Sequence, residues 1–216
     1  VVVYKNFIKR LIDIILSVAG IAVLALPMII IAVMIKIDSH GPVLFRQKRV
    51  GIHKQYFNIL KYRSMPVSAP HDTPTHELKR ADVVLTKFQR FIRKYSIDEL
   101  PQLCCIFAGK MSIVGPRPAL WNQYDLLDER EKYGANDIKP GLTGLAQISG
   151  RDELDICTKA RLDGEYTSTL NAGHGKGFAM DCRCFFETVR SVLRHDGVAE
   201  GADNRANSEK MEKVRQ

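Results

Sequence analysis

The most prominent pattern in the chain is an apolar run near its start, residues 14–35, which contains no charged residue. At about 1.5 Å per helical residue, a helix over this run could just cross the hydrocarbon core of a bilayer. Pro27 lies near its middle, where a proline kinks or breaks a helix. Basic residues flank the run on both sides, which favours keeping both ends cytoplasmic. We expect a helix–break–helix that enters and leaves the same leaflet, with a kinked spanning helix as the alternative.

Residues 43–63 combine β-branched, aromatic and basic side chains around a turn at Gly51. This composition predicts a β-hairpin. The segment contains no acidic residue, so the hairpin would be a basic ribbon directly after the membrane segment. Such a ribbon would face lipid headgroups or a phosphorylated substrate.

Helical spacing of apolar residues dominates the remainder of the chain. A proline-rich loop at 66–76 precedes a predicted helix over 77–95. Pro101 belongs in a first helical turn, which predicts a short helix from near Asp98 to Phe107. Further helices are expected over 121–133 and within 178–195, separated by glycine-rich loops at 115–118 and 139–147. The fold class predicted is α+β and mostly helical, and the polar residues 197–216 are predicted to be disordered.

The chain has 216 residues, which leaves room for one domain plus a membrane element. Lys and Arg number 32 against 24 for Asp and Glu, and the resulting net charge of +8 favours anionic partners. Nucleic acid, acidic lipid and phosphorylated substrates all fit that description. The 5 cysteines form no Cys-x-x-Cys pair, which argues against a disulfide framework or a cysteine-rich zinc site.

Asp98 and Glu99 are the strongest candidates for chemistry. A helix N-terminus binds phosphate and favours ionised carboxylates. Side chains one residue apart do not share a helix face, so the two acids would have different tasks. One could attack phosphorus while the other holds Mg²⁺ on phosphate oxygens. The alternative is structural, because Ser96 and Glu99 have the spacing of a capping box.

Two carboxylates would repel a diphosphate, so cations must lie close to them. Guanidinium groups bind phosphate oxygens in bidentate fashion, although each candidate could equally form a surface salt bridge. The candidates for phosphate binding are Lys61, Arg63, Arg93 and Arg117, with Thr143 and Gln147 as weaker candidates for loop contacts to substrate.

Several longer motifs occur in a distinctive order. They are Lys9-Arg10-Leu-Ile-Asp13, Gly41-Pro42-Val-Leu-Phe45-Arg-Gln47-Lys-Arg49-Val-Gly51, Phe57-Asn-Ile-Leu-Lys61-Tyr-Arg63-Ser64-Met65, Ser96-Ile-Asp98-Glu99-Leu100-Pro101-Gln102, Met111-Ser112-Ile-Val114-Gly115-Pro116-Arg117-Pro118, and Lys139-Pro140-Gly141-Leu-Thr143-Gly144-Leu-Ala146-Gln147 with Gly150-Arg151. In this order, behind a proline-interrupted apolar run, the chain resembles the bacterial sugar transferases, which are monotopic polyprenol-phosphate phosphoglycosyl transferases. The resemblance covers about Lys9 to Arg151 and continues weakly to Val198.

The resemblance implies a two-step reaction. Asp98 would attack the β-phosphate of a UDP-sugar, UMP would leave, and a phosphosugar would remain on the enzyme. Polyprenol phosphate, in bacteria undecaprenyl phosphate, would then take the phosphosugar to give a polyprenol-diphosphate sugar. The resemblance also implies that Glu99 helps to bind Mg²⁺ and that Arg117 contributes to nucleotide-sugar binding.

The resemblance further implies a location at the bacterial inner membrane, with the active site on the cytoplasmic face. It divides the chain into a re-entrant helix broken near Pro27 (residues 1–38), a cytosolic catalytic core (39–151), interfacial helices (152–198) and a polar tail (199–216). Two departures from the family stand out. The residue before the proline is Leu26 where serine is common, which slightly favours a kinked span. Residues 168–177 are polar and glycine-rich, which predicts a turn and weaker membrane contact.

Two non-enzymatic functions are the alternatives: a membrane-anchored adaptor that binds anionic lipid, and a membrane-anchored nucleic-acid binder. Neither explains the acidic dyad or the Gly-Pro-Arg-Pro loop. We therefore expect a UDP-sugar, undecaprenyl phosphate and membrane lipid as partners, Mg²⁺ as cofactor and no nucleic acid, with room for a homodimer. The first membrane step of capsule, exopolysaccharide or O-antigen synthesis is the expected role. Glucose, galactose, N-acetylglucosamine and modified sugars all remain compatible.

Overall fold

The computed structural model describes residues 3–69, 85–150, 154–173 and 175–194. Within these ranges the chain is mostly helical with two small sheets, so the mostly helical α+β prediction is confirmed. The domain boundaries inferred from the resemblance stay predictions, and the polar tail at 199–216 lies outside the described residues.

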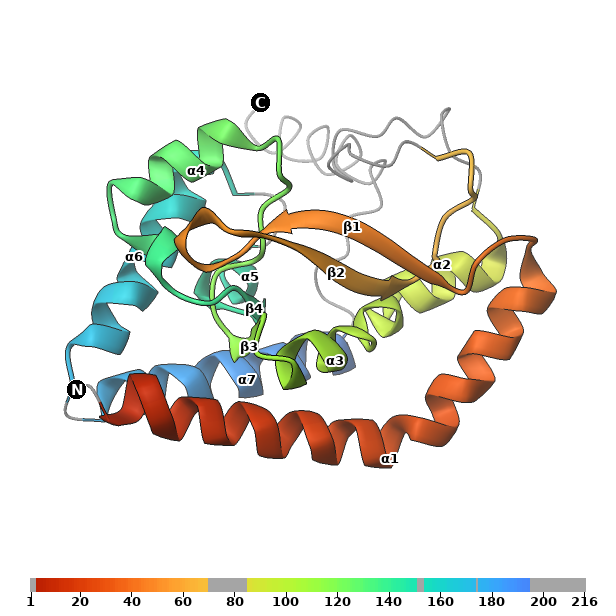
Figure 1. Cartoon of the computed structure of the whole chain (residues 1–216), viewed down its shortest axis with the longest axis horizontal. Helices are drawn as coiled ribbons and strands as arrows, with labels where there is room; N and C mark the ends of the chain where they lie inside the picture. Colours follow the sequence, from red (N-terminus) through yellow and green to blue (C-terminus); the bar gives the residue numbers. More distant parts are fainter. Residues whose placement is uncertain (1–2, 70–84, 151–153, 174, 195–216) are drawn as a thin grey trace, which may run out of the picture.

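Helix α1 (Lys9–Asp38) follows a short helical segment at Tyr4–Ile8 and includes the whole apolar run. The predicted break at Pro27 is a bend instead: Figure 1 shows one helix that runs along the base of the molecule and then turns sharply upward. A proline inside a helix removes one backbone hydrogen bond and presses on the preceding turn, which accounts for a bend without an interruption.

The first half of α1 is attached to the rest of the molecule by polar side chains. Lys9, Asp13 and Ser17 recur every four residues and are buried, so they share one face of the helix. Asp13 Oδ1 accepts hydrogen bonds from Ser112 Oγ at 3.0 Å and from the backbone N–H of Ile113 at 2.8 Å. This polar face of α1 packs against the rest of the molecule, and the apolar faces of α1 point away from it.

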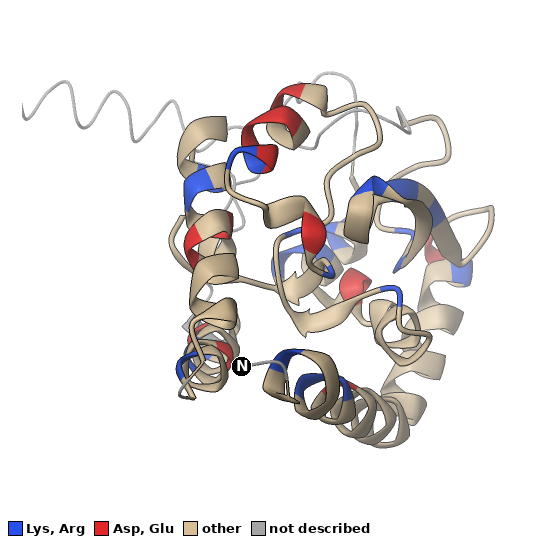
Figure 2. Cartoon of the chain, turned by 60° about the vertical axis from the view of Figure 1, so that its left-hand side comes forward, with Lys and Arg blue, Asp and Glu red and all other residues tan. Residues whose placement is uncertain are grey.

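Most of α1 is exposed apolar surface. The helical stretch Tyr4–Asp38 contains an 18-residue window with a mean hydropathy of 2.9, of which only 6% is buried. By length and composition this helix could cross a membrane, and its low burial distinguishes it from a core helix. Val23 is 75% exposed and Leu26 is 67% exposed. In Figure 2 the middle of α1 carries no charged residue. Charged residues lie near the ends of this helix and over the rest of the molecule.

The predicted hairpin is confirmed. Strands β1 (Leu44–Val50) and β2 (Tyr56–Tyr62) pair antiparallel, with Leu44 opposite Tyr62 and Val50 opposite Tyr56. Ile59 and Tyr62 of β2 are buried, so the strand is anchored in the core at its centre and at its end. The hairpin lies across the centre of the molecule, above α1 in Figure 1.

A second sheet joins the two glycine-rich loops. Strand β3 (Ser112–Val114) pairs parallel with β4 (Gly141–Thr143). A Cβ at Gly115 would lie 2.4 Å from the carbonyl oxygen of Lys139, so only glycine permits this close approach. The pairing brings loop 115–118 beside loop 139–147, although they are far apart in sequence.

Short helices surround these strands: α2 (Lys87–Lys94), α3 (Gln102–Phe107), α4 (Tyr124–Glu131) and α5 (Leu145–Ile148). The helix predicted over 77–95 begins at Lys87, because Thr86 caps it; residues 77–84 lie outside the described ranges. Thr86 Oγ1 accepts from the N–H of Gln89 at 3.1 Å, and Gln89 Oε1 accepts from the N–H of Thr86 at 3.2 Å. This reciprocal capping box defines the helix start.

The C-terminal helices are α6 (Ile156–Asn171) and α7 (Lys176–Arg194). The predicted turn lies between them, with Gly173 and Gly175 both at φ 74°. Figure 1 shows α7 beside the first half of α1, and Tyr4, in the segment before α1, donates to Asp181 Oδ2 of α7 at 2.6 Å. Large apolar side chains of α7 also remain exposed: Phe178, Phe185, Phe186 and Val189.

Candidate active site

The acidic dyad lies in a short 3₁₀ turn, Ile97–Glu99, just before α3. Ser96 precedes it in the left-handed conformation, with φ 54°, and its side chain makes no capping hydrogen bond. The structural alternative of a capping box at Ser96 and Glu99 is therefore wrong. Asp98 is 9% exposed and the Glu99 side chain is 15% exposed, so the turn holds two acidic groups that have largely lost water.

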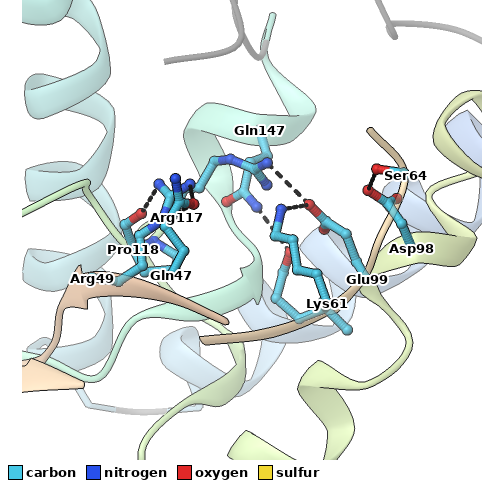
Figure 3. Close-up of polar contacts among 10 residues, drawn as sticks. Gln47, Arg49, Lys61, Ser64, Asp98, Glu99, Arg117, Pro118 and Gln147 are labelled. Carbon is cyan, nitrogen blue, oxygen red and sulfur yellow. Dashed lines mark hydrogen bonds and ion pairs between the residues drawn. The ribbon is translucent and has the colours of Figure 1, made fainter. Parts of the chain in front are cut away.

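Glu99 is held between two cations. Lys61 Nζ from β2 lies 2.8 Å from its Oε1, and Arg117 Nη2 lies 3.0 Å from the same oxygen (Figure 3). Burial alone would raise the pKa of Glu99, but Lys61 and Arg117 hold that pKa far below its usual range. Glu99 is therefore an ionised carboxylate in a nearly water-free position.

Asp98 points away from this cluster and has a different partner. Ser64 Oγ, just beyond the end of β2, donates a hydrogen bond to Asp98 Oδ2 at 3.0 Å. Burial raises the pKa of Asp98, while Lys61 and then Arg93 counteract the shift. The two acids of the dyad thus occupy distinct environments, as expected for groups with different tasks.

Arg117 is presented by a rigid loop. The N–H of Gly115 donates to Thr143 O at 2.8 Å, and the N–H of Gly141 donates to Pro116 O at 2.8 Å. Two further guanidinium groups hold the loop carbonyls: Arg130 Nη2 donates to Arg117 O at 3.0 Å, and Arg49 Nη1 donates to Pro118 O at 2.9 Å. The Arg117 side chain is nevertheless 45% exposed, so a fixed backbone carries an accessible cation.

The sequence matches the family described as bacterial sugar transferase over residues 4–195, which is most of the chain. The chain belongs to the bacterial sugar transferase family. The family resemblance inferred from the motifs is therefore confirmed.

Three relatives illustrate the similarity. Undecaprenyl-phosphate glucose phosphotransferase of Komagataeibacter xylinus is 43% identical over 195 residues, which cover 86% of this chain and 36% of that protein. Undecaprenyl-phosphate galactose phosphotransferase of Salmonella typhimurium is 34% identical over 214 residues, covering 89% and 42%. Exopolysaccharide production protein PSS of Rhizobium leguminosarum is 35% identical over 193 residues, covering 86% and 95%. This sugar transferase chain thus spans less than half of the first two relatives and nearly all of the third.

The structure gives Arg63 a task different from the predicted phosphate contact. Its guanidinium is buried and donates to the carbonyl oxygens of Ser39 at 2.6 Å and His40 at 2.9 Å, just after α1. Both of its terminal nitrogens are thus engaged by protein, and only its buried Nε has no hydrogen-bond partner among the described residues. We therefore replace the predicted role of Arg63 by attachment of the α1 C-terminus to the hairpin.

The other residues predicted to contact substrate differ in whether their polar atoms are already bonded within the protein. Thr143 is buried and shares a hydrogen bond with Thr188 of α7, so it holds β4 in place instead of facing substrate. Gln147 donates from Nε2 to Leu142 O at 2.9 Å, and its buried Oε1 has no hydrogen-bond partner among the described residues. Arg93 likewise has a buried Nε that no described residue satisfies. Gln147 and Arg93 therefore retain polar atoms for a ligand.

Mg²⁺ was expected from the resemblance to the family. No group of three or more His, Cys, Asp or Glu side chains that could enclose a metal occurs within the described ranges. Mg²⁺, however, commonly takes only one or two carboxylates and completes its shell with water and substrate phosphates. The ionised Glu99 carboxylate, next to the place where a diphosphate would meet Arg117, fits a single-carboxylate site of this kind.

Several residues of this region were given no role from sequence. Ser64 and Arg49 lie within recognised motifs, but the pattern carries no information on which distant group each side chain contacts. Arg130 and its partner Asp163 lie in stretches with no chemical signature at all. Only the fold brings Arg130 Nε within 2.8 Å of Asp163 Oδ2.

Proposed function

We propose that the chain transfers a sugar-1-phosphate from a UDP-sugar to undecaprenyl phosphate, giving a polyprenol-diphosphate sugar and UMP. The observation that carries this proposal is the divided dyad, in which Glu99 is ionised between Lys61 and Arg117 while Asp98 is held separately by Ser64. Two relatives named as undecaprenyl-phosphate glucose and galactose phosphotransferases support the substrate classes.

In the first step, one carboxylate oxygen of Asp98 attacks the β-phosphorus of the UDP-sugar. The new bond joins this oxygen to phosphorus, and the bond from phosphorus to the UMP oxygen breaks, so UMP leaves with the electron pair. The product on the enzyme is an aspartyl phosphosugar. Lys61 and Arg117 lie where they can neutralise phosphate oxygens as charge develops, and positioned cations are the main protein contribution to phosphoryl transfer.

In the second step, the phosphate oxygen of undecaprenyl phosphate attacks the same phosphorus, and Asp98 leaves as a carboxylate. The enzyme is thereby restored without any change in oxidation state. Arg93, whose Nε is buried and unsatisfied among the described side chains, contributes a further cation for a phosphate oxygen near Asp98. Glu99 is the residue that would hold Mg²⁺, and a bound ion would supply positive charge to offset that of the phosphates.

We propose that α1 is re-entrant, because both of its ends are attached to the same globular body. At the start, Lys9 Nζ donates to Asp181 Oδ2 at 2.7 Å. At the end, Thr86 Oγ1 donates to Asp38 Oδ2 at 2.9 Å. A straight span would separate its ends by the roughly 30 Å hydrocarbon core. The bend keeps both ends on one side, and we assign that side to the cytoplasmic face of the bacterial inner membrane.

The proposed pathway is synthesis of a surface glycan such as exopolysaccharide, capsule or O-antigen. A relative of nearly the same length is named as an exopolysaccharide production protein, which supports the first of these. The transferred sugar stays open between glucose, galactose and related sugars, since relatives of both the glucose and the galactose type match the chain.

The decisive experiment is UMP release by purified protein in lipid nanodiscs. The reaction would contain Mg²⁺, undecaprenyl phosphate and, in turn, UDP-glucose, UDP-galactose and UDP-N-acetylglucosamine. Release that requires both the lipid and Asp98, with Asp98→Asn as the control, is the expected result. Equal UMP release by Asp98→Asn would contradict the covalent mechanism, and no release from any donor would contradict the transferase assignment.

A further inference from the structure

Ser64 is hydrogen-bonded to the proposed nucleophile, and neither of the two steps above assigns it a task. It follows the end of β2, is 7% exposed, and directs its hydroxyl at Asp98. The distance from Ser64 Oγ to Asp98 Oδ2 is 3.0 Å, and Figure 3 shows the two side chains set apart from the Lys61–Glu99–Arg117 cluster. The Ser64 hydroxyl therefore contacts the carboxylate that is proposed to react.

The backbone that carries Ser64 is fixed on both sides of the hairpin. The N–H of Arg63 donates to Val43 O at 2.9 Å, and the Arg63 guanidinium is bonded to the carbonyls after α1. The hydroxyl of Tyr62 donates to Met28 O at 2.9 Å, within α1. Ser64 is therefore attached to a rigid support that includes the membrane helix, as a positioning group requires.

Asp98 needs such a support because the terminal torsion of an aspartate is broad. A freely rotating carboxylate would offer either oxygen to phosphorus in many orientations. A hydrogen bond to Oδ2 removes that freedom. A hydrogen bond from a hydroxyl to an ionised carboxylate oxygen is stronger than one between two neutral groups. Among the described residues, Asp98 Oδ1 accepts no hydrogen bond, so it is the oxygen left to react.

We propose that Ser64 is a positioning residue that holds Oδ2 of Asp98 and so presents Oδ1 to the β-phosphorus. This inference rests on the proposed transferase function. In the first step the bond forms between Oδ1 and phosphorus while the bond to the UMP oxygen breaks. In the second step the Oδ1–phosphorus bond breaks in favour of the lipid phosphate oxygen. Ser64 keeps its own proton throughout and remains bonded to Oδ2.

The test compares Ser64→Ala, which removes only the hydroxyl oxygen, with Ser64→Thr, which retains it. We expect the alanine variant to form the covalent phosphosugar adduct about ten- to a hundredfold more slowly in single-turnover mass spectrometry, the range expected for loss of a hydrogen bond to a charged group. Its Kd for the UDP-sugar should stay within about twofold of wild type, because the hydroxyl contacts the nucleophile and not the donor. The threonine variant should recover most of the rate.

Ser112→Ala is the matched control, because Ser112 Oγ also donates to a buried aspartate, Asp13, at 3.0 Å. Asp13 keeps its bond from the N–H of Ile113 in this variant. We expect a similar small change in unfolding temperature for both alanine variants, with slow adduct formation only in Ser64→Ala. A wild-type rate in Ser64→Ala, or a threonine variant as slow as the alanine variant, would overturn the positioning role. Absence of UMP release and adduct in wild type would overturn the proposed function itself and the inference with it.

Discussion

Lys61 and Arg117 share a single oxygen of Glu99, yet the two cations differ in exposure. The Lys61 side chain is 15% exposed, whereas Arg117 is 45% exposed. Burial lowers the pKa of Lys61, although Glu99 opposes the shift, so that lysine is tied to its carboxylate. Arg117, which is more exposed, contacts the same oxygen. We infer that Lys61 mainly holds Glu99 in place and neutralises charge from there, whereas Arg117 can exchange the carboxylate oxygen for a substrate phosphate oxygen.

This division predicts different consequences for the two cations. Arg117→Met should lower kcat/KM for the UDP-sugar by about 100-fold with little loss of stability, because a charge-assisted contact to phosphate is removed from an exposed position. Arg117→Lys should recover only part of the loss, since an ammonium lacks the planar fork. Steady-state UMP release measures both, and unchanged kinetics in Arg117→Met would contradict the substrate role.

A second prediction concerns Arg63. Because its guanidinium bonds carbonyls just after α1, Arg63→Met should lower the unfolding temperature and leave the Kd for the UDP-sugar unchanged. The free energy of unfolding should fall by about 2 kcal/mol, since the partly buried hydrogen bonds from a charged donor to the carbonyls of Ser39 and His40 are lost. Thermal unfolding in detergent, together with nucleotide-sugar binding by calorimetry, checks both parts. A weakened Kd at unchanged stability would restore the original interpretation of Arg63 as a phosphate ligand.

At the scale of elements, helices α4 and α6 are joined by a buried ion pair that also supports the Arg117 loop. Arg130 Nη2 lies 2.7 Å from Asp163 Oδ2, with side chains 7% and 2% exposed. The same Nη2 donates to the carbonyl of Arg117. The pair therefore connects packing between two helices to the position of a residue in the site.

Asp163→Asn should destabilise the protein by about 3–5 kcal/mol, because it leaves the Arg130 charge buried without its partner. Glu129→Gln is the control on the same helix: Glu129 pairs with the exposed Lys132, and loss of a surface pair costs about 0–1 kcal/mol. Denaturant unfolding of both variants in the same detergent gives the comparison. Equal stability of the two variants would show that the buried pair contributes nothing beyond a surface pair.

The elements that the sequence predicted well are those whose signal is local. β-branched, aromatic and basic residues around a glycine turn sufficed for the hairpin. The acidic dyad was predicted at the start of a helix from Asp98, whereas it lies in a 3₁₀ turn and α3 begins at Gln102. The start of α2 was missed because apolar spacing over residues 77–85 masked the capping box at Thr86 and Gln89. The polar face of α1 was missed because Lys9 was taken as a flanking charge and Asp13 had no evident partner.

The site itself could be predicted only in its charged members. Glu99, Lys61 and Arg117 converge as expected, because opposite charges attract, whereas Asp98 lies in the same turn but points to Ser64. Ser64 and Arg130 form contacts across long sequence separations, and neither spacing nor residue type specifies those contacts. Arg63 was assigned to phosphate from its charge alone, whereas the end of a helix offers carbonyls that compete for the same guanidinium.

At the scale of the whole molecule, exposed apolar side chains lie on α1 and on α7, which run side by side at the base in Figure 1. The polar faces of both helices meet at Asp181, which accepts from Lys9 at 2.7 Å and from Tyr166 at 2.7 Å. Much of the exposed apolar surface is therefore gathered on the α1 and α7 side of the molecule. This arrangement suits a body that rests on one leaflet.

The proposed topology predicts that both ends of α1 are protected from reagents outside the cell. Small epitope tags placed at the N-terminus and after Ser68 should both resist protease added to intact bacteria, and both should be cleaved after the inner membrane is opened. A tag in a known periplasmic protein controls for outer-membrane permeability. Cleavage of the N-terminal tag alone in intact inner membranes would instead indicate a kinked spanning helix.

The bond from Ile113 N–H to Asp13 makes the membrane helix a component of the catalytic architecture. β3 is the short strand that delivers the Arg117 loop, and one of its backbone donors is satisfied from inside α1. An unrelated anchor fused in its place would leave that donor buried and unsatisfied, at a cost of about 1–3 kcal/mol. Changes at the exposed apolar positions of α1 would leave this contact intact, whereas exchange of the whole helix would remove it. The helix that could enter the membrane thus also supports the strand that leads to the Arg117 loop.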